Sequence, residues 1–519
     1  MQPVTELDEH AERQDNMNRE RSDPPGSMRV SRSSRSALSV GLALAFVVAA
    51  CGGAATTPSP SAPPSSGSAP SASTPTAPPT SGPAAPTPAT SGGSSGGAGG
   101  GGRSPAPAKT IAQPASPADL PIAPDSARID LAMPTFSDPT NVTNPLFPIS
   151  RQESVVLLGE VDGAAFRTEV TLLPGTRVVT WEGQAVETLV SQYVAYLDGQ
   201  LHEVAYDLYA QDDGGSVWYF GEDVFNFADG FIADTHGTWL AGRDGPAAMI
   251  MPADPQVGDV YRPENAPGLV FEEVTVKTID KSLDGPLGPI EGGMVASEMH
   301  MDGTTEEKIF APRYGEFLTA SGPDSEGLAL AVPTDAAAGA VPADVAALGK
   351  AAMAALDAAS TEDWPAASQA ADGAATAWTK VSAEEVPSLF RPRLDEQVKA
   401  LGAAVDARDA GAAQAAIDVA RSSLDLQLRH RAPREVDTAR FDLWARELAI
   451  DAAAGDVAAV RADFFSLDYV RDRIDPVLDE ADRTTINATL EELLGAVNDE
   501  DLDLAAELAD QLITMTPPS

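Results

Sequence analysis

Residues 127–333 alternate between apolar and polar side chains over short runs, which is the pattern of half-buried β-strands. The runs that predict strands are 152–161, 166–173, 177–181, 188–197, 201–209, 217–220, 269–279, 293–300 and 307–311. Pairs such as Asp198-Gly199 and Asp229-Gly230 separate them, and glycine there permits the positive φ of a tight turn. Because no helical pattern lies between most of these runs, we predict a mainly antiparallel sheet that forms a barrel or sandwich.

From residue 342 to residue 515 the apolar positions recur with a helical period and alanine dominates. Asp363, Asp409, Asp456 and Asp501 each lie between two such runs, at separations of 46, 47 and 45 residues. An aspartate accepts hydrogen bonds from the free N–H groups at a helix start. The spacing therefore predicts four helical hairpins, with helices of roughly 16–22 residues.

The helical segment also contains a longer repeat, because 398–409 is similar to 490–501 at an offset of 92 residues. This offset indicates a tandem duplication of a two-hairpin unit. Paired four-helix bundles and a short stack of repeats are both compatible with it, and we favour bundles because alanine permits close helix approach. The fold class predicted is multidomain α+β: an antiparallel β-rich barrel- or sandwich-like domain at 127–333, then an all-α domain of four helical hairpins at 342–515.

The amino end has the features of an export signal. An apolar run of 14 residues, 37–50, follows Arg29, Arg32 and Arg35. It is too short to span a bilayer, which needs about 20 residues, and its length is typical of a signal-peptide core. We therefore predict a signal peptide with a polar N-terminal extension at 1–50, and the start codon at Met1 or Met28 stays open.

The apolar run ends in Val48-Ala49-Ala50-Cys51, which resembles the lipobox of bacterial lipoproteins. The resemblance implies that the Cys51 sulfur receives a diacylglycerol and becomes the new amino terminus after cleavage. Two acyl chains give stable anchoring, so a lipidated, palmitate-bearing Cys51 would hold the protein on the extracytoplasmic face of the cell membrane. The alternative interpretation is a buried core cysteine after an ordinary helix.

A tether of restricted composition follows, since 52–102 contains only Gly, Ala, Ser, Thr and Pro. Such a sequence buries too little apolar surface to offset the entropy lost on ordering. We predict a lipidated cysteine and disordered tether at 51–125.

The net charge is −43, from 77 acidic and 34 basic residues, which argues against a nucleic-acid partner because phosphate binding depends on Lys and Arg. The single cysteine excludes a disulfide framework and an iron–sulfur cluster.

Several short stretches of the β-rich segment resemble a group of uncharacterised exported bacterial proteins. They include Asn-Pro-Leu-Phe-Pro at 144–148, Tyr-Ala-Gln-Asp at 209–212 and Val-Trp-Tyr-Phe-Gly-Glu-Asp at 217–223. The resemblance implies a shared fold and an extracytoplasmic setting. It supplies no catalytic residues.

No metal site is predicted from the histidines. His202, His236, His300 and His430 lack zinc-ligand spacing. Met299-His300-Met301 offers soft ligands for copper, but strand alternation puts the methionines on one face and His300 on the other, which favours core methionines.

Four acidic residues, Asp212, Asp213, Glu222 and Asp223, bracket the strand that contains Trp218. Their oxygens suit calcium, but they lack the order of an EF-hand loop. A solvated acidic rim is therefore the favoured interpretation.

The helical segment is acidic, with 34 acidic and 16 basic residues in 342–515. Its most basic cluster is Arg429, His430, Arg431 and Arg434, which we expect either to dock an anionic partner or the β-rich domain, or to cap helix C-termini.

These patterns predict a non-enzymatic, membrane-anchored surface lipoprotein that presents its two domains to another envelope component. The alternative is an extracytoplasmic binding protein for a small apolar ligand or a metal ion in the β-rich domain, and a hydrolase with residues that converge only in three dimensions ranks third. No catalytic residue, metal site or cofactor is assigned. Expected partners are membrane lipid through Cys51 and an envelope protein or small ligand.

Overall fold

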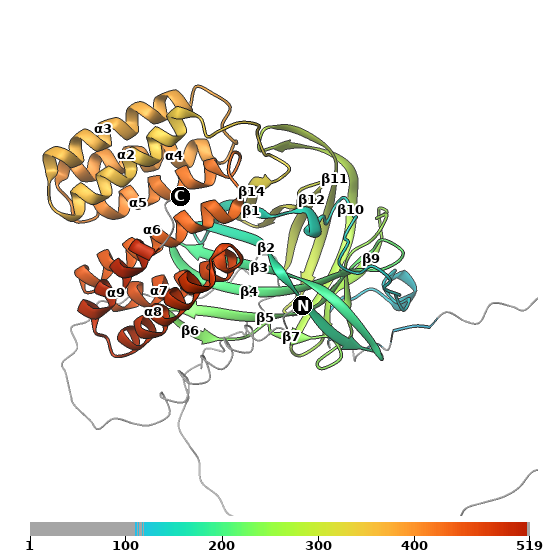
Figure 1. Cartoon of the computed structure of the whole chain (residues 1–519). Helices are drawn as coiled ribbons and strands as arrows, with labels where there is room; N and C mark the ends of the chain where they lie inside the picture. Colours follow the sequence, from blue (N-terminus) through green and yellow to red (C-terminus); the bar gives the residue numbers. More distant parts are fainter. Residues whose placement is uncertain (1–108, 112, 114–116, 118, 516–519) are drawn as a thin grey trace, which may run out of the picture. The chain divides into compact units, whose positions relative to one another are not determined.

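The computed structural model describes residues 109–111, 113, 117 and 119–515 of the chain (Figure 1). From Thr110 onward, the described residues belong to one compact unit. The predicted signal peptide, the lipobox Val48, Ala49 and Ala50, and Cys51 lie outside the described residues. Within the described ranges, no helix combines the length and the apolar character needed to cross a bilayer.

Fourteen strands form one antiparallel sheet, as the alternating pattern predicts. They are β1 (Ser154–Val161), β2 (Ala164–Trp181), β3 (Gln184–Leu197), β4 (Gln200–Gln211), β5 (Val217–Ala228), β6 (Phe231–Asp234), β7 (Trp239–Leu240), β8 (Ala248–Met251), β9 (Val260–Ala266), β10 (Val270–Gly285), β11 (Gly288–His300), β12 (Thr305–Ala311), β13 (Gly315–Ser321) and β14 (Asp324–Val332).

The first and last strands pair at the centre of the sheet. The order is β6-β5-β4-β3-β2-β1-β14-β13-β12-β11-β10-β9, and β7 and β8 also pair with β5. The sheet curls until its two ends meet. The contact between the ends includes a hydrogen bond of 3.0 Å from the indole N–H of Trp239, in β7 beside β5, to Glu264 Oε1 in β9. The curl gives the sheet an inner face and an outer face (Figure 1).

Some strands differ from the prediction. The runs 166–173 and 177–181 form one strand, β2, with an irregular register between Leu172 and Thr176. Six strands were not predicted: β6, β7, β8, β9, β13 and β14. In β9 the sequence contains Pro263, which a strand tolerates because β9 lies at the end of the ladder.

Eight helices follow the sheet. They are α2 (Ala343–Ser360), α3 (Trp364–Val381), α4 (Phe390–Ala407), α5 (Ala412–Gln427), α6 (Pro433–Ala454), α7 (Val457–Ile474), α8 (Glu480–Asn498) and α9 (Leu502–Met515). Within α2–α5, α2 contacts both α3 and α5, and α4 contacts both α3 and α5. The same closed pattern joins α6–α9, so the helices form two four-helix bundles, the packing that we favoured from the duplication (Figure 1).

Each of the four predicted hairpins turns in the same way. The residue before each predicted aspartate has a positive φ of 50–80°, and the aspartate N–H bonds to the carbonyl five residues earlier at 2.9–3.0 Å. This bond is the 6→1 bond of a Schellman-type helix end. The turns are Glu362-Asp363, Arg408-Asp409, Gly455-Asp456 and Glu500-Asp501.

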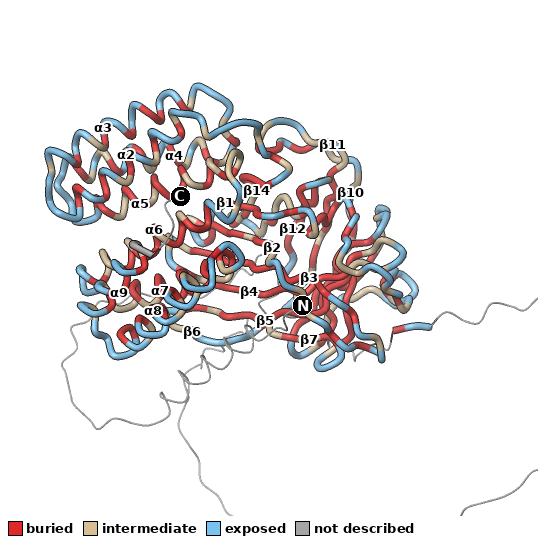
Figure 2. The backbone as a smooth tube through the Cα atoms, in the orientation of Figure 1, coloured by how far each residue is buried: buried red, intermediate tan, exposed pale blue. Residues whose placement is uncertain are grey.

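The sheet and the second bundle share one hydrophobic cluster, and α7 packs on β2, β4 and β6. Tyr196 in β3 stacks on Trp444 in α6 with ring centroids 5.2 Å apart. Both faces of the central strands are therefore buried, one by helices and one by the curl of the sheet (Figure 2).

The predicted tether extends too far along the chain. Ile111 is buried, and its N–H bonds to the Leu131 carbonyl. Gln113 accepts hydrogen bonds from Arg128 and Asn265. Packing therefore begins near residue 110 rather than after residue 125, because the apolar side chain of Ile111 is buried and the half-buried amide of Gln113 gains hydrogen-bond partners.

Candidate functional site inside the sheet

Carboxylates line the inner face of the curled sheet. On β4, Glu203 and Asp207 alternate with Val204 and Tyr206, which face the helices, so the acids point inward. Neighbouring strands repeat this placement, and each acid has at most 6% of its surface exposed. The eight buried acids are Glu203, Asp207, Glu222, Glu264, Glu272, Glu298, Glu306 and Glu326.

Six of these acids form pairs that lie directly opposite each other on adjacent antiparallel strands. Like charges in this position destabilise a sheet, and burial increases the cost. The pairs are Asp207 with Glu222, Glu264 with Glu272, and Glu298 with Glu306.

Two basic side chains offset part of this charge. The Lys308 ammonium lies 2.7 Å from Glu298 Oε1 and 3.5 Å from Glu306 Oε1. His300 lies opposite Glu272, with Nδ1 3.3 Å from Glu272 Oε1 and Nε2 3.7 Å from Glu306 Oε2. Burial opposes the charge of His300, but its bonds to Glu272 and Glu306 prevail and raise its pKa to about 11. Burial by itself would raise the pKa of Glu306. The positive charges of Lys308 and His300 outweigh this effect and hold that pKa below its usual value.

The remaining acids have no basic partner within 4 Å among the described residues. Burial raises the pKa of Glu203 to about 8, and nearby Asp207 adds to the rise. Burial also raises the pKa of Asp207 to about 7, although the Tyr219 hydroxyl donates to its carboxylate at 2.8 Å. Burial raises the pKa of Glu326 to about 8. Near neutral pH these groups therefore retain protons that exposed acids would lose.

Glu222 and Glu264 are buried neighbours where the two ends of the sheet meet, and burial raises the pKa of each. Burial and the charge of Glu264 raise the pKa of Glu222 well above its usual value. Glu264 also accepts the indole hydrogen bond of Trp239. This pair therefore retains protons at pH values where exposed acids have lost them.

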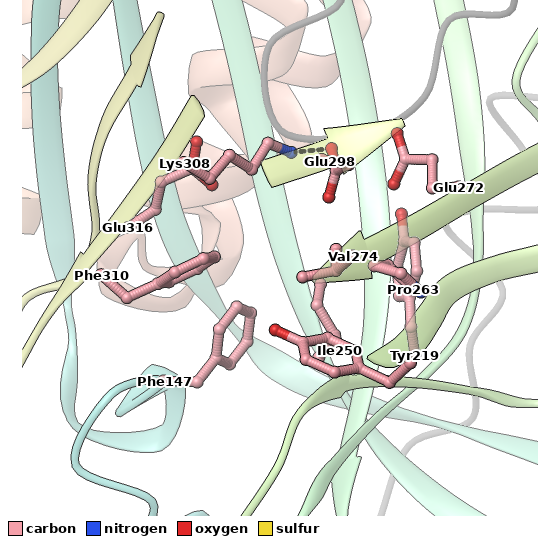
Figure 3. A pocket seen from close by; sticks show the side chains of 11 residues that line it. Phe147, Tyr219, Ile250, Pro263, Glu272, Val274, Glu298, Lys308, Phe310 and Glu316 are labelled. Carbon is pink, nitrogen blue, oxygen red and sulfur yellow. Dashed lines mark ion pairs between the residues drawn. The ribbon is translucent and has the colours of Figure 1, made fainter. Parts of the chain in front are cut away.

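A small cavity of about 20 Å³ opens between the acids and a group of aromatic and apolar side chains (Figure 3). Glu272 and Glu298 lie along one side with the Lys308 ammonium, and Phe147, Phe310 and Tyr219 lie on the other. A second cavity of about 50 Å³ contains Asp207 and Ser191, and Glu316 lines both cavities.

Two neutral polar groups in the cavity walls have no hydrogen-bond partner in the part of the chain that the structure describes. The Tyr261 hydroxyl lines the smaller cavity and the Ser191 hydroxyl lines the larger one. Both residues are buried. A buried hydroxyl without a partner costs free energy, so each is a free oxygen ligand for a bound ion or water.

Glu272, Glu298 and His300 form a candidate metal-binding group, because one donor atom of each lies within 4.8 Å of the others. Two oxygens on opposite sides of a Ca²⁺ ion lie about 4.6–5.2 Å apart, so the spacing fits a divalent cation. The two carboxylates supply hard oxygen ligands, and the imidazole adds a nitrogen that transition metals accept once a bound metal displaces the proton that Glu272 and Glu306 hold on His300.

Sequence reasoning did not predict this group. It assigned no metal site, and it compared His300 only with its neighbours Met299 and Met301. Met301 Sδ accepts a hydrogen bond from Gly268 N at 3.3 Å, whereas His300 faces Glu272 and Glu306. The available signal was the alternation of acids along strands whose other face is apolar, as in 203–208.

Of the four acidic residues around Trp218, only Glu222 contradicts the solvated rim that we favoured, since Asp213 is exposed and Asp212 and Asp223 are half-buried. Asp212 accepts the Trp218 indole N–H at 2.8 Å and stabilises a local turn, whereas Asp213 accepts the Ser137 N–H at 2.8 Å and joins that turn to a distant segment of the chain. Glu222 is buried inside the sheet, and Asp223 pairs with Arg177 at 2.7 Å. The curl of the sheet, which the sequence does not specify, removes Glu222 from solvent.

Part of the predicted basic cluster lies at the connection between the sheet and the helices. Arg429 donates to the Asp335 carbonyl at 3.3 Å and pairs with Glu385 at 2.9 Å. These contacts join Arg429 to the segments that follow β14 and α3, rather than to the β-rich domain itself.

Comparisons of the chain with protein-family models, with curated proteins and with solved structures found no match.

Proposed function

We propose that this protein is a non-enzymatic, membrane-anchored binding protein of the extracytoplasmic face, and that the inside of its sheet holds a divalent cation. The single observation that carries the proposal is the three pairs of buried carboxylates that lie opposite each other, with only Lys308 and His300 as ion-pair partners among the described residues. A bound cation offsets the repulsion that this arrangement creates.

The cavity volumes support an ion rather than an organic ligand. Volumes of about 20 and 50 Å³ exceed the roughly 10–15 Å³ that one water needs. They are far below the roughly 300–1,000 Å³ of pockets for small organic molecules. Of the two ligands in the alternative prediction, the metal ion therefore has the better support, and the apolar ligand has none inside the sheet.

Presentation of the domains to an envelope protein has less support. The described residues with large exposed apolar side chains come from separate segments of the chain, which does not suggest one apolar docking face. They are Ile129, Val178, Val257, Leu269, Val477 and Leu504.

Cation binding to the full chain tests the proposal. After chelator treatment, Ca²⁺, Mg²⁺, Mn²⁺ and Zn²⁺ are each titrated by calorimetry, and retained metal is counted by mass spectrometry. We expect one ion per chain for at least one of these metals. Glu298→Gln removes a charged ligand and should weaken binding by about tenfold or more.

Glu307→Gln is the matched control, because Glu307 lies on β12 between Glu306 and Lys308 but is exposed. It should bind the ion as the unchanged chain does. If no metal binds, or if Glu307→Gln weakens binding as much as Glu298→Gln, the proposal fails.

A further inference from the structure

A groove of about 560 Å³ runs between the two helical bundles, remote from the acids inside the sheet. Helices α2 and α5 of the first bundle and α6 and α9 of the second contribute its walls. This volume lies in the range of sites for small organic ligands.

The floor of the groove is apolar. Met353 and Leu424 are half-buried against the core of the first bundle, and Ile513 against the core shared by the second bundle and the sheet. Leu443 lies between them and is buried. The groove therefore offers a strip of hydrocarbon between two packed cores.

The charged side chains that line the groove are mainly basic, although the helical segment around it has twice as many acids as bases. Lys350, Arg431 and Arg446 line it with a single acid, Asp442. Such a local reversal of sign attracts an anion that the rest of the chain repels.

The ion pairs of these basic groups are weak or absent, although Arg431 also donates hydrogen bonds to Gln427 Oε1 and to the Glu435 carbonyl, both at 3.0 Å. Arg446 pairs with Asp442 and with the exposed Asp357, both at 3.1 Å, and Arg431 lies 3.6 Å from the exposed Glu435. Lys350 is exposed and has no ion pair with any described residue. Exposed pairs contribute about 0–1 kcal/mol, so a ligand anion exchanges for them at little cost.

We propose that this groove binds a free amphiphilic anion, with its carboxylate or phosphate head at Lys350, Arg431 and Arg446 and its hydrocarbon body along Met353, Leu424 and Ile513. The basic side chains of the groove select the anionic head of the ligand, and the volume of the groove fits a hydrocarbon chain of moderate length. The site is independent of the cation site inside the sheet.

Calorimetry on the full chain with three ten-carbon probes tests the proposal, each kept below its micelle-forming concentration. The probes are decanoate, decanol and decyltrimethylammonium. We expect decanoate to bind with one site per chain, and the neutral and cationic probes to bind at least about tenfold more weakly, because loss of one charge-assisted contact changes affinity by about that factor.

Arg446→Gln and Lys350→Gln should each weaken decanoate binding by roughly tenfold. Arg434→Gln is the matched control, because Arg434 is an exposed residue of α6 that does not line the groove. It should leave binding unchanged. Glu298→Gln, which alters the cation site, should also leave it unchanged.

Equal binding of decanol and decanoate would overturn the proposal, as would equal weakening by Arg434→Gln. Absence of decanoate binding at millimolar concentration would do the same. Sedimentation velocity adds a further test: if the unchanged chain is a dimer that Arg446→Gln dissociates, a second copy occupies the groove and the proposal is wrong.

Discussion

Two ionised carboxylates that lie opposite each other inside a protein repel each other strongly, so each pair needs a proton or a cation. Lys308 and His300 serve this role for Glu306 and Glu272, but Lys308 does so only in part for Glu298, because burial and Glu272 raise the pKa of Glu298 to about 8. Burial raises the pKa values of the other inward acids, so these acids retain protons. At the scale of single residues, protons and bound metal therefore compete for the same interior.

This competition predicts that the metal-free protein loses stability as the pH rises. The pKa of Glu203 is about 8 in the folded chain and 4.5 in the unfolded reference, so the folded state binds the extra proton between these values. The stabilisation is fully present below pH 4.5 and is lost as the pH rises through 8. Urea unfolding at pH 5, 7 and 9 measures it, and we expect a decrease of up to roughly 4 kcal/mol for each such carboxyl.

Glu203→Gln removes one titrating group and should make the dependence on pH shallower, whereas Glu307→Gln, on the exposed side of β12, should leave it unchanged. A free energy of unfolding that rises between pH 5 and pH 9 in metal-free protein would contradict this account.

At the scale of elements, the four hairpins use one turn with different residues. The residue with positive φ is glycine only at Gly455, while Glu362, Arg408 and Glu500 adopt the same conformation with a side chain. The aspartate that follows this residue accepts hydrogen bonds from different N–H groups in different hairpins. Asp456 accepts hydrogen bonds from Ala458 N and Ala459 N, whereas Asp409 accepts one from Gly411 N within the turn.

Asp456→Ala should therefore destabilise the chain by about 1 kcal/mol, because α7 loses its N-cap. Asp409→Ala should cost less, since Gly411, not Asp409, occupies the N-cap of α5. Chemical denaturation of both variants measures the difference. An equal loss in the two variants would show that the turn, rather than the cap, sets the effect.

At the scale of the whole molecule, a buried network of charges joins the sheet to the helices. Arg167 in β2 pairs with Asp425 in α5 at 2.8 Å, and Arg473 in α7 pairs with Glu169 in β2. Three arginines hold the pKa of Glu169 well below its usual value although burial opposes them. The network therefore links the second bundle and α5 to the sheet. Removal of one partner of such a pair would leave the other partner charged and buried, which is strongly destabilising.

The location of the whole molecule depends on Cys51 in the interpretation that we propose. Cys51→Ser should abolish labelling with radioactive palmitate and move the protein from the membrane fraction to the soluble fraction, because the acyl chains supply the anchor. Cell fractionation with the labelled fatty acid measures both effects. A variant that stays in the membrane fraction as firmly as the unchanged chain would refute the anchor.

The sequence by itself determined the type and the order of the elements. Strand alternation over 152–209 and the recurring aspartates at Asp363, Asp409, Asp456 and Asp501 are local signals, because each depends on residues a few positions apart. Short or proline-containing strands such as β8 and β9 carried no such signal, since they form only where the rest of the sheet provides a neighbour.

Only the tertiary structure decided which residues form the candidate site. Glu264, Glu272 and Glu298 are ordinary polar positions in three strands, and Asp207 and Glu222 are opposite each other only because of strand register. Whether a strand residue faces water or the interior depends on how the whole sheet curls and on what covers its outer face. That information resides in contacts between distant segments, so the alternation along 203–208 indicates a strand with one acidic face but does not indicate that this face is buried.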